Sequence, residues 1–216
     1  YIAKNGLWHH DPTNTHKLAQ GEISYYIQGG LITGGTQGGI TSFGASIGND
    51  ITLNGGTIAG NINTDINGGG GGISLSSCIS LTMTGGAIFA NYSHYGDRGG
   101  GGGIRLLDQC KFKMTGGLIF RNYANQGGGI AIRDSSATLL GGKIIRNKTL
   151  GDRGSHGGLD FISSSEKNLL VIGGDIIITN NYNGLDDSNL GLNTIGANYC
   201  FISDISKFRN EDSAEN

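Results

Sequence analysis

Short alternations of apolar and polar residues recur along most of this chain, and each is followed by a pair of glycines. The glycine pairs begin at residues 29, 55, 85, 116, 141 and 173, at intervals of 25 to 32 residues. Before most pairs, two apolar residues flank one other residue, in the couples Ile51/Leu53, Leu81/Met83, Phe112/Met114 and Leu169/Val171. A period of two is the pattern of a strand with one buried face. Each repeat is therefore predicted to carry a strand before its glycines.

Three further features keep step with the glycine pairs. Two residues after each pair stands an isoleucine, at Ile32, Ile58, Ile88, Ile119, Ile144 and Ile176. An asparagine stands five residues after four of the pairs and slips by one in the sixth, at Asn61, Asn91, Asn122, Asn147 and Asn180. A glycine run precedes another apolar couple, at Ile73/Leu75, Ile104/Leu106, Ile130/Ile132 and Leu159/Phe161. These features predict three short strands per repeat.

Three short strands cannot bury a face alone, but stacked copies can, with like residues about 4.8 Å apart in columns. The asparagine column is predicted to form a structural ladder, hydrogen-bonded from turn to turn. No segment between residues 23 and 178 sustains helical spacing, and the repeats are too short for a propeller blade of about 40–50 residues. The expected fold class is all-β: a right-handed parallel β-helix of about seven coils with capped ends, the handedness following from the usual crossover rule.

The two ends of the chain depart from the repeat. A β-helix with open ends would polymerise, so we expect residues 1–22 to form an N-terminal cap with Trp8 over the first coil. The β-helix is assigned to residues 23–202, and residues 203–216 to a C-terminal cap or linker with a short helix over 204–210. The chain starts at Tyr1 without a methionine, so we expect a mature form or a piece of a longer protein.

The segments GGAI at 85–88 and FRNYANQGGGI at 120–130 carry a resemblance to a known group. Over roughly residues 23–182, the chain resembles the pectin-lyase-like β-helices of chlamydial polymorphic outer-membrane proteins and many bacterial adhesin-like surface proteins. This resemblance implies a secreted, surface-displayed passenger or adhesin domain. The resemblance identifies no catalytic residue in this chain, because the shared repeats are structural.

Composition narrows the range of partners. The chain has 42 glycines among 216 residues, charged residues make up 15%, and the net charge is −2. Such a chain has no excess of positive charge that would bind nucleic acid or an anionic membrane. No apolar run approaches the roughly 20 residues of a transmembrane helix, so direct membrane insertion is not expected.

Coil length varies in one place and suggests a binding edge. The short loop 123–129 stands between two longer loops, 92–103 and 148–158, which predicts a notch. Insertions on one edge of a solenoid often mark its binding face. The candidate binding residues there are Tyr92, His94, Tyr95, Asp97, Arg98, Tyr123, Asp152, Arg153 and His156. Aromatic faces beside hydrogen-bonding groups suit a sugar or a protein epitope; the alternative is that the tyrosines cover the stack and the Asp-Arg pairs brace their own loops.

Catalytic patterns do not converge in the sequence. Asp65 and Asp186, which resemble fragments of a polygalacturonase site, fall four coils apart, about 19 Å at the stacking distance, whereas inverting glycosidases hold their carboxyl groups about 6.5–9.5 Å apart. A lyase would need acids for Ca²⁺ beside a basic residue, and Asp160 is expected to point outward alone. No catalytic residue, metal or cofactor is therefore assigned.

Histidine and cysteine offer little further chemistry. One cluster has metal-binding residue types, namely His9, His10, Asp11 and His16. Adjacent residues on a strand point to opposite faces and rarely bind one metal ion together, so the cluster is assigned to the cap. Cys78 and Cys110 take nearly the same place in successive coils, and either buried thiols or a disulfide would fit.

Three functions remain open at this point. The favoured hypothesis is a non-catalytic binding module, extracellular or on the cell surface, that recognises a glycan or a host or partner protein through one edge. The alternatives are a polysaccharide lyase or hydrolase on the pectin-lyase-like fold and a passive structural stalk.

Overall fold

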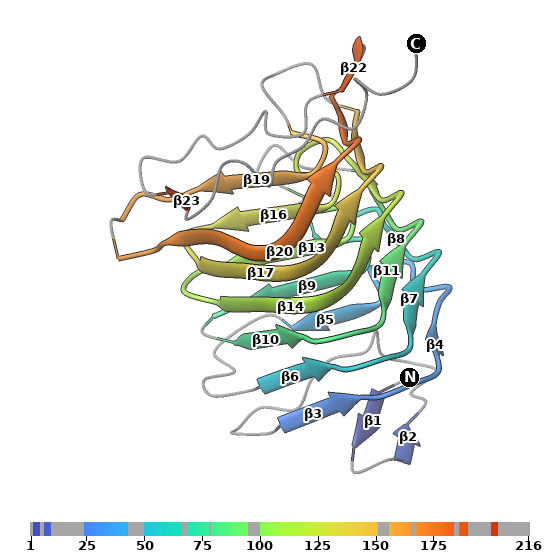
Figure 1. The fold of residues 1–216 in the computed structure, drawn as a ribbon. Coiled ribbons are helices and arrows are strands. Elements are labelled where there is room, and N and C mark those ends of the chain that lie inside the picture. Colours follow the sequence, from blue (N-terminus) through green and yellow to red (C-terminus); the bar gives the residue numbers. More distant parts are fainter. Residues whose placement is uncertain are drawn as a thin grey trace.

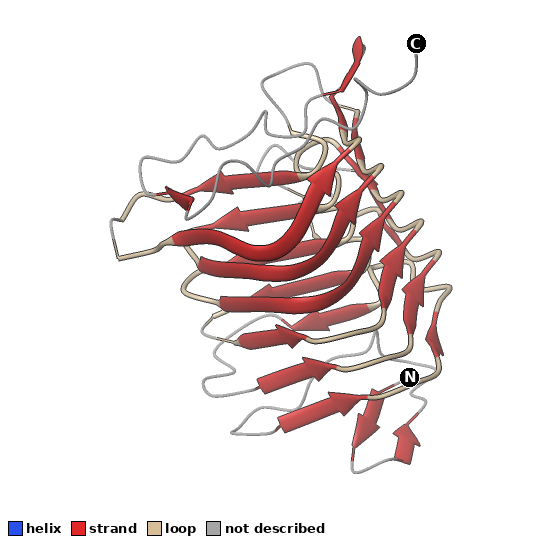
Figure 2. Cartoon of the chain, viewed as in Figure 1, coloured by secondary structure: helices blue, strands red, loops and turns tan. Residues whose placement is uncertain are grey.

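Every regular element of the described chain is a β-strand (Figure 2). The computed structural model describes residues 2–4, 7–9, 24–42, 50–65, 69–77, 79–94, 100–150, 156–165, 167–183, 186–189 and 200–202. The predicted short helix over 204–210 lies outside these residues, as does the side chain of Trp8.

Three sheets form the walls of a coil. The ten-stranded sheet contains β3 (Ser24–Ile27), β4 (Leu31–Ile32), β6 (Asp50–Leu53), β7 (Thr57–Ala59), β10 (Ser80–Met83), β11 (Ala87–Phe89), β14 (Lys111–Phe120), β17 (Ser136–Ile145), β20 (Leu170–Thr179) and β23 (Cys200–Ile202). The six-stranded sheet contains β8 (Ile62–Asn63), β12 (Tyr92–Ser93), β15 (Tyr123–Ala124), β18 (Lys148–Thr149), β21 (Tyr182–Asn183) and β22 (Asp186–Asn189). The five-stranded sheet contains β5 (Ile40–Ser42), β9 (Ile73–Ser76), β13 (Ile104–Leu107), β16 (Ile130–Arg133) and β19 (Leu159–Ile162).

The chain is a right-handed parallel β-helix. Strands of the ten-stranded sheet run from left to right across the near wall of Figure 1, and those of the five-stranded sheet return from right to left while the chain climbs. All pairings within these walls are parallel except that of β22 with β21. At the N-terminal end, β1 (Ile2–Lys4) and β2 (Leu7–His9) form an antiparallel hairpin, and β1 contacts β3.

The prediction of about seven coils was too high. Among the described residues, four turns place strands in all three walls, namely β6–β7–β8–β9, β10–β11–β12–β13, β14–β15–β16 and β17–β18–β19. The strands before β6 and after β19 add only partial turns at the ends of the stack. Six glycine pairs mark the repeats, and the first and the last of them belong to these partial turns.

Columns of like residues fill the interior. Ile58, Ile88, Ile119 and Ile144 lie in register on successive strands, and each is fully buried. Parallel pairing likewise stacks Leu53, Met83, Met114 and Leu139, and it stacks Ile73, Ile104 and Ile130. Since burying one such side chain contributes about 1.5–3 kcal/mol, the columns supply the main driving force for stacking.

The glycine pairs turn the chain from one part of the ten-stranded sheet to the next. Gly86, like the second glycine of the other pairs, has a positive φ, here 77°. A Cβ atom on Gly85 would lie 2.1 Å from the carbonyl oxygen of Asn54 on the preceding turn. Glycine is required for both reasons: backbone conformation at one position and close approach between turns at the other.

A ladder of asparagine side chains runs up the inside of the corner that precedes the six-stranded sheet. The Nδ2 atoms of Asn61, Asn91, Asn122 and Asn147 each donate to the Oδ1 atom of the asparagine one turn further on, over 2.9–3.0 Å. The same Oδ1 atoms accept the backbone N–H of the previous asparagine, and Nδ2 also donates to an isoleucine carbonyl of the previous turn. These amides are fully buried and fully paired.

The sixth repeat is out of step with the sequence prediction. Asn181, not Asn180, continues the ladder, and Ile178, not Ile176, continues the isoleucine column. The inward couple is Leu170/Ile172, whereas Leu169 is 44% exposed. The physical reason is an irregularity in β20: Gly173 follows Ile172 directly, and one residue is inserted before Asp175 pairs with Gly141.

Replacing Asn122 by alanine should destabilise the fold strongly. The change removes the acceptor of two N–H donors on Asn91 and the donor to the Ile88 carbonyl, all of them buried. With about 1–3 kcal/mol for each buried group left unpaired, we expect the free energy of unfolding to fall by at least about 3 kcal/mol. Denaturant titration measures this loss. The matched control is Asn54→Ala at an exposed position; equal effects of the two changes would contradict the role of the ladder.

Candidate functional site

A row of outward side chains crosses the six-stranded sheet. In β8, β12, β15 and β18 the second residue faces the interior, so the first faces outward, and parallel pairing places these first residues and the first residue of β21 side by side. They are Ile62, Tyr92, Tyr123, Lys148 and Tyr182, which we name the tyrosine row. Tyr123 is 38% exposed and Tyr92 and Tyr182 are half-buried. The row therefore offers aromatic surface over several adjacent turns.

A second column lies at the corner beside the tyrosine row. The residue before each ladder asparagine has a left-handed backbone, and its φ values are 66° at Gly60, 52° at Ala90, 51° at Arg121, 55° at Arg146 and 51° at Asn180. Both arginine side chains are exposed. This conformation makes the sharp corner of every turn, and two successive turns fill it with arginine.

The corner and the tyrosine row together line a surface pocket of about 460 Å³, which we name the corner groove. Within the described part of the chain, its lining residues are Arg121, Tyr123, Arg146, Lys148 and Tyr182. Three of these are cationic, two are aromatic, and none is acidic. Such a lining can attract an anionic group and pack against a flat, partly apolar ligand.

The structure brings together only part of the predicted binding set. Tyr92 and Tyr123 are direct neighbours on paired strands. The hydroxyl of Tyr92 lies 2.7 Å from Nδ1 of His94, and the two rings meet edge to face. The Nδ2 atom of Asn125, from the short loop, donates to the His94 carbonyl. Five predicted residues, Tyr95, Asp97, Arg98, Asp152 and Arg153, lie outside the described residues.

His156 belongs to a different place, the outer side of the five-stranded sheet. Its Nδ1 lies 3.2 Å from Oδ1 of Asp160, and Nη2 of Arg133 donates to Oδ2 of the same carboxylate. Arg133 also donates to Oε1 of Gln126 over 2.9 Å. We name these four residues the ionic cluster. The Asp160 side chain is only 5% exposed, so its charge requires these partners.

Glycine-rich segments cover this outer face. A Cβ atom on Gly70 would lie 3.2 Å from the backbone nitrogen of Arg105, and one on Gly127 would lie 2.8 Å from Cβ of Ala131. Arg105 itself is 4% exposed although it projects away from the core. The runs of glycine therefore let the chain lie flat against the sheet.

Burial and neighbouring charges shift the pKa values of two side chains in this region. Burial by itself raises the pKa of Asp160, but the hydrogen bond from His156 and the charge and hydrogen bond of Arg133 outweigh it, so the pKa lies below its ordinary value. Burial and the nearby charge of Arg133 lower the pKa of Arg105 to about 10, and Asp108 and Asp65 partly offset this. Both side chains are therefore charged at neutral pH.

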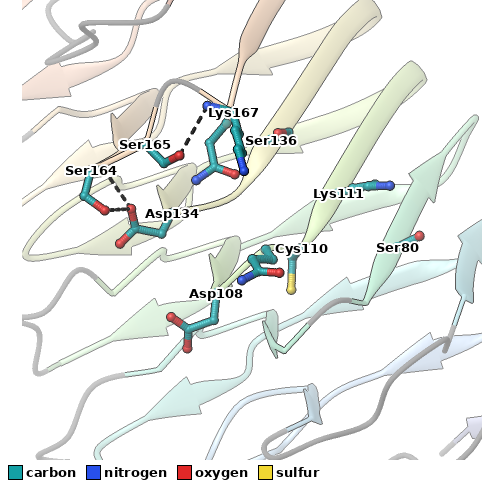
Figure 3. Close-up of a pocket in the computed structure, with 11 residues that line it drawn as sticks. Ser80, Asp108, Cys110, Lys111, Asp134, Ser136, Ser164, Ser165 and Lys167 are labelled. Carbon is teal, nitrogen blue, oxygen red and sulfur yellow. Dashed lines mark hydrogen bonds between the residues drawn. The ribbon is translucent and has the colours of Figure 1, made fainter.

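A further pocket, of about 600 Å³, lies at the corner between the five-stranded and ten-stranded sheets (Figure 3). Its lining is polar: Ser80, Asp108, Gln109, Cys110, Lys111, Asp134, Ser136, Ser164, Ser165, Lys167 and Asn168. Figure 3 shows Asp134 turned toward Ser164, whose backbone N–H and hydroxyl both donate to its Oδ1. These two bonds hold the pKa of Asp134 below its usual range. Cys110 is buried at the base, and Cys78 lies outside the described residues.

The two aspartates considered as a hydrolase pair do not lie together. Asp65 follows β8 and Asp186 begins β22, and these strands stand at opposite ends of the six-stranded sheet. Within the described part of the chain, no group of three or more His, Cys, Asp or Glu residues could hold a metal ion. The same residues contain no helix that is long and apolar enough to cross a membrane.

Sequence reasoning missed the convergence of Arg133 with Asp160 and the corner arginines. Asp160 was expected to point outward alone, but Arg133 on the preceding turn reaches it. The available signal was positional: Asp160 lies between two inward residues, and Arg133 follows such a couple one turn earlier. Arg121 and Arg146 each directly precede a ladder asparagine.

Comparisons of the chain with protein-family models, with curated proteins and with solved structures found no match.

Replacing Asp160 by asparagine should destabilise the protein at neutral pH, by about 3 kcal/mol, because a buried charge pair loses one partner. The pKa of Asp160 is lowered on folding, so the carboxylate stabilises the fold above its unfolded pKa of about 4 and loses this effect as pH falls through the lower folded value. The difference between wild type and variant should therefore shrink below about pH 4.

Denaturant titration across this pH range measures that difference, with the exposed Asp50→Asn as the matched control. A difference that persists undiminished in acid, or that the control reproduces, would show that the charge of Asp160 is not its source.

Proposed function

We propose that this chain is a non-catalytic binding module, extracellular or on the cell surface, that holds a glycan or a partner protein against the tyrosine row. The observation that carries the proposal is the corner groove, where the exposed Tyr123 and the half-buried Tyr182 stand two turns apart with Lys148 between them. Ring faces beside hydrogen-bonding groups are a common recognition surface for such ligands.

The construction of the fold supports this reading. Inward residues are occupied with packing and with the asparagine ladder, so the outward residues can vary without loss of the stack. The repeats at 85–88 and 120–130 resemble those of adhesin-like surface proteins. Under this proposal the module belongs to a longer, surface-displayed chain.

The tyrosines provide the test. Tyr123→Ala and Tyr182→Ala should each weaken binding of the wild-type ligand by about tenfold, the equivalent of about 1.4 kcal/mol of lost ring contact. The ligand is first identified on arrays of neutral and acidic glycans and of extracellular proteins, and affinity is then measured by titration calorimetry.

Tyr26→Ala is the matched control, because Tyr26 is 56% exposed and lies on β3 at the other end of the stack. If Tyr26→Ala lost binding while Tyr123→Ala and Tyr182→Ala kept it, the corner groove would not be the binding site. No binding to any array component would favour the passive stalk.

A polysaccharide lyase or hydrolase is the second candidate. The ionic cluster and the neighbouring Arg105 favour it, because Arg105, Arg133 and Asp160 gather charge on the outer face of adjacent turns. Incubation with uronate polymers and glycosaminoglycans, with and without Ca²⁺, should release unsaturated or reducing ends if this candidate holds. The absence of products from wild-type protein, or products that Asp160→Asn leaves unchanged, counts against catalysis by the cluster.

A further inference from the structure

Two residues of the corner column, Arg121 and Arg146, are not explained by stability alone. A left-handed backbone strains most side chains, and glycine and asparagine tolerate it best. The same corner is occupied in other turns by Gly60, by Asn180 and by Ala90, which has a small uncharged side chain. Arg121 and Arg146, on two successive turns, have the strained conformation with a long charged side chain.

Neither arginine is used to hold the fold together. Within the described ranges, the guanidinium groups of Arg121 and Arg146 have no hydrogen-bond or ion-pair partner, and both side chains are exposed. This contrasts with Arg133, which is hydrogen-bonded to Asp160, Gln126 and a backbone carbonyl. The two corner arginines line the groove together with Lys148, and among the described residues no acidic side chain lines it with them.

We infer that the corner groove takes an anionic glycan, one whose sugars carry carboxylate or sulfate groups. Arg121 and Arg146 bind the anionic groups in this arrangement, while Tyr123 and Tyr182 pack against the sugar rings. The inference rests on the proposed function and specifies its ligand.

The spacing of the groups favours a glycan over other polyanions. Adjacent turns lie about 4.8 Å apart, so the two arginines offer one charge per turn, and one monosaccharide unit has a similar length. Duplex DNA carries one charge per about 1.7 Å of its axis, much denser than this column. Tyr123 and Tyr182 are two turns apart, so the two rings are separated by about two monosaccharide lengths.

The double variant Arg121→Asn, Arg146→Asn tests the inference. Asparagine already fills this corner at residue 180, so the melting temperature should stay unchanged or rise as strain is relieved. Binding of alginate oligosaccharides or of heparin should weaken at least tenfold, and the salt dependence of binding should flatten. Alginate carries carboxylates alone and heparin carries sulfates as well, so comparing them identifies the anionic group that is recognised.

Two matched controls make the result specific. Lys111→Gln, Lys113→Gln removes two exposed positive charges from β14, outside the groove, and should leave binding nearly unchanged. Carboxyl-reduced alginate keeps the sugar backbone without its charge and should bind at least tenfold more weakly than alginate.

Equal binding of the reduced and the charged polymer, or undiminished binding by the arginine variant, would overturn the inference. So would a single-stranded oligonucleotide or an anionic phospholipid vesicle that binds more tightly than both glycans with the same dependence on the two arginines. If the tyrosine variants lose binding and the arginine variant keeps it, the proposed function is supported and the inference of an anionic ligand is contradicted. A wild-type protein that binds neither alginate nor heparin would contradict the inference, whereas the proposed function fails only if no neutral glycan or protein on the arrays binds either.

Discussion

In-register stacking of successive turns is the constraint on which the rest of this structure depends. A single turn would expose its apolar face and the amide of its ladder asparagine. Only the turns above and below it bury the apolar face and pair the amide. The isoleucine column supplies apolar burial, and the asparagine ladder fixes the register, because each Oδ1 accepts from the neighbouring turn at a defined position. A solenoid of this kind is stabilised by nearest-neighbour terms, so its regularity follows from repeated local contacts.

Stacking also separates the tasks of inward and outward residues. The inward positions of paired strands are restricted to residues that fill a column, whereas the outward positions change from turn to turn. In the tyrosine row, for example, isoleucine, tyrosine and lysine occupy equivalent places. Polar side chains on adjacent turns are thereby brought close together without any sequence proximity. The ionic cluster and the corner groove both arise in this way, on different walls of the coil.

The fold could be predicted from the sequence because its columns appear as a regular spacing. Ile58, Ile88, Ile119 and Ile144 keep the same distance from their glycine pairs, and they form one column in the structure. The prediction was wrong in the sixth repeat, where a glycine pair was assumed to mark the same place. There Gly173 directly follows the inward Ile172, and an irregularity in β20 shifts the later residues.

The candidate site was less predictable for a physical reason. Neighbouring side chains on adjacent turns are 25 or more residues apart in sequence, and the outward rows have no hydrophobic period to reveal them. Arg133 and Asp160 are separated by 27 residues, yet they share a hydrogen bond. The left-handed corner conformation that Arg121 and Arg146 share with Gly60, Ala90 and Asn180 is likewise visible only in the structure.

Dipolar coupling between pairs of nitroxide labels tests the register of the stack most directly. Thr52, Thr82, Lys113 and Thr138 lie side by side on the outside of four successive strands. Labels on neighbouring turns, at 82 and 113 or at 113 and 138, should couple equally and strongly. Labels two turns apart, at 52 and 113 or at 82 and 138, should couple equally and more weakly. Coupling strengths that do not follow the number of intervening turns would contradict the stacked arrangement.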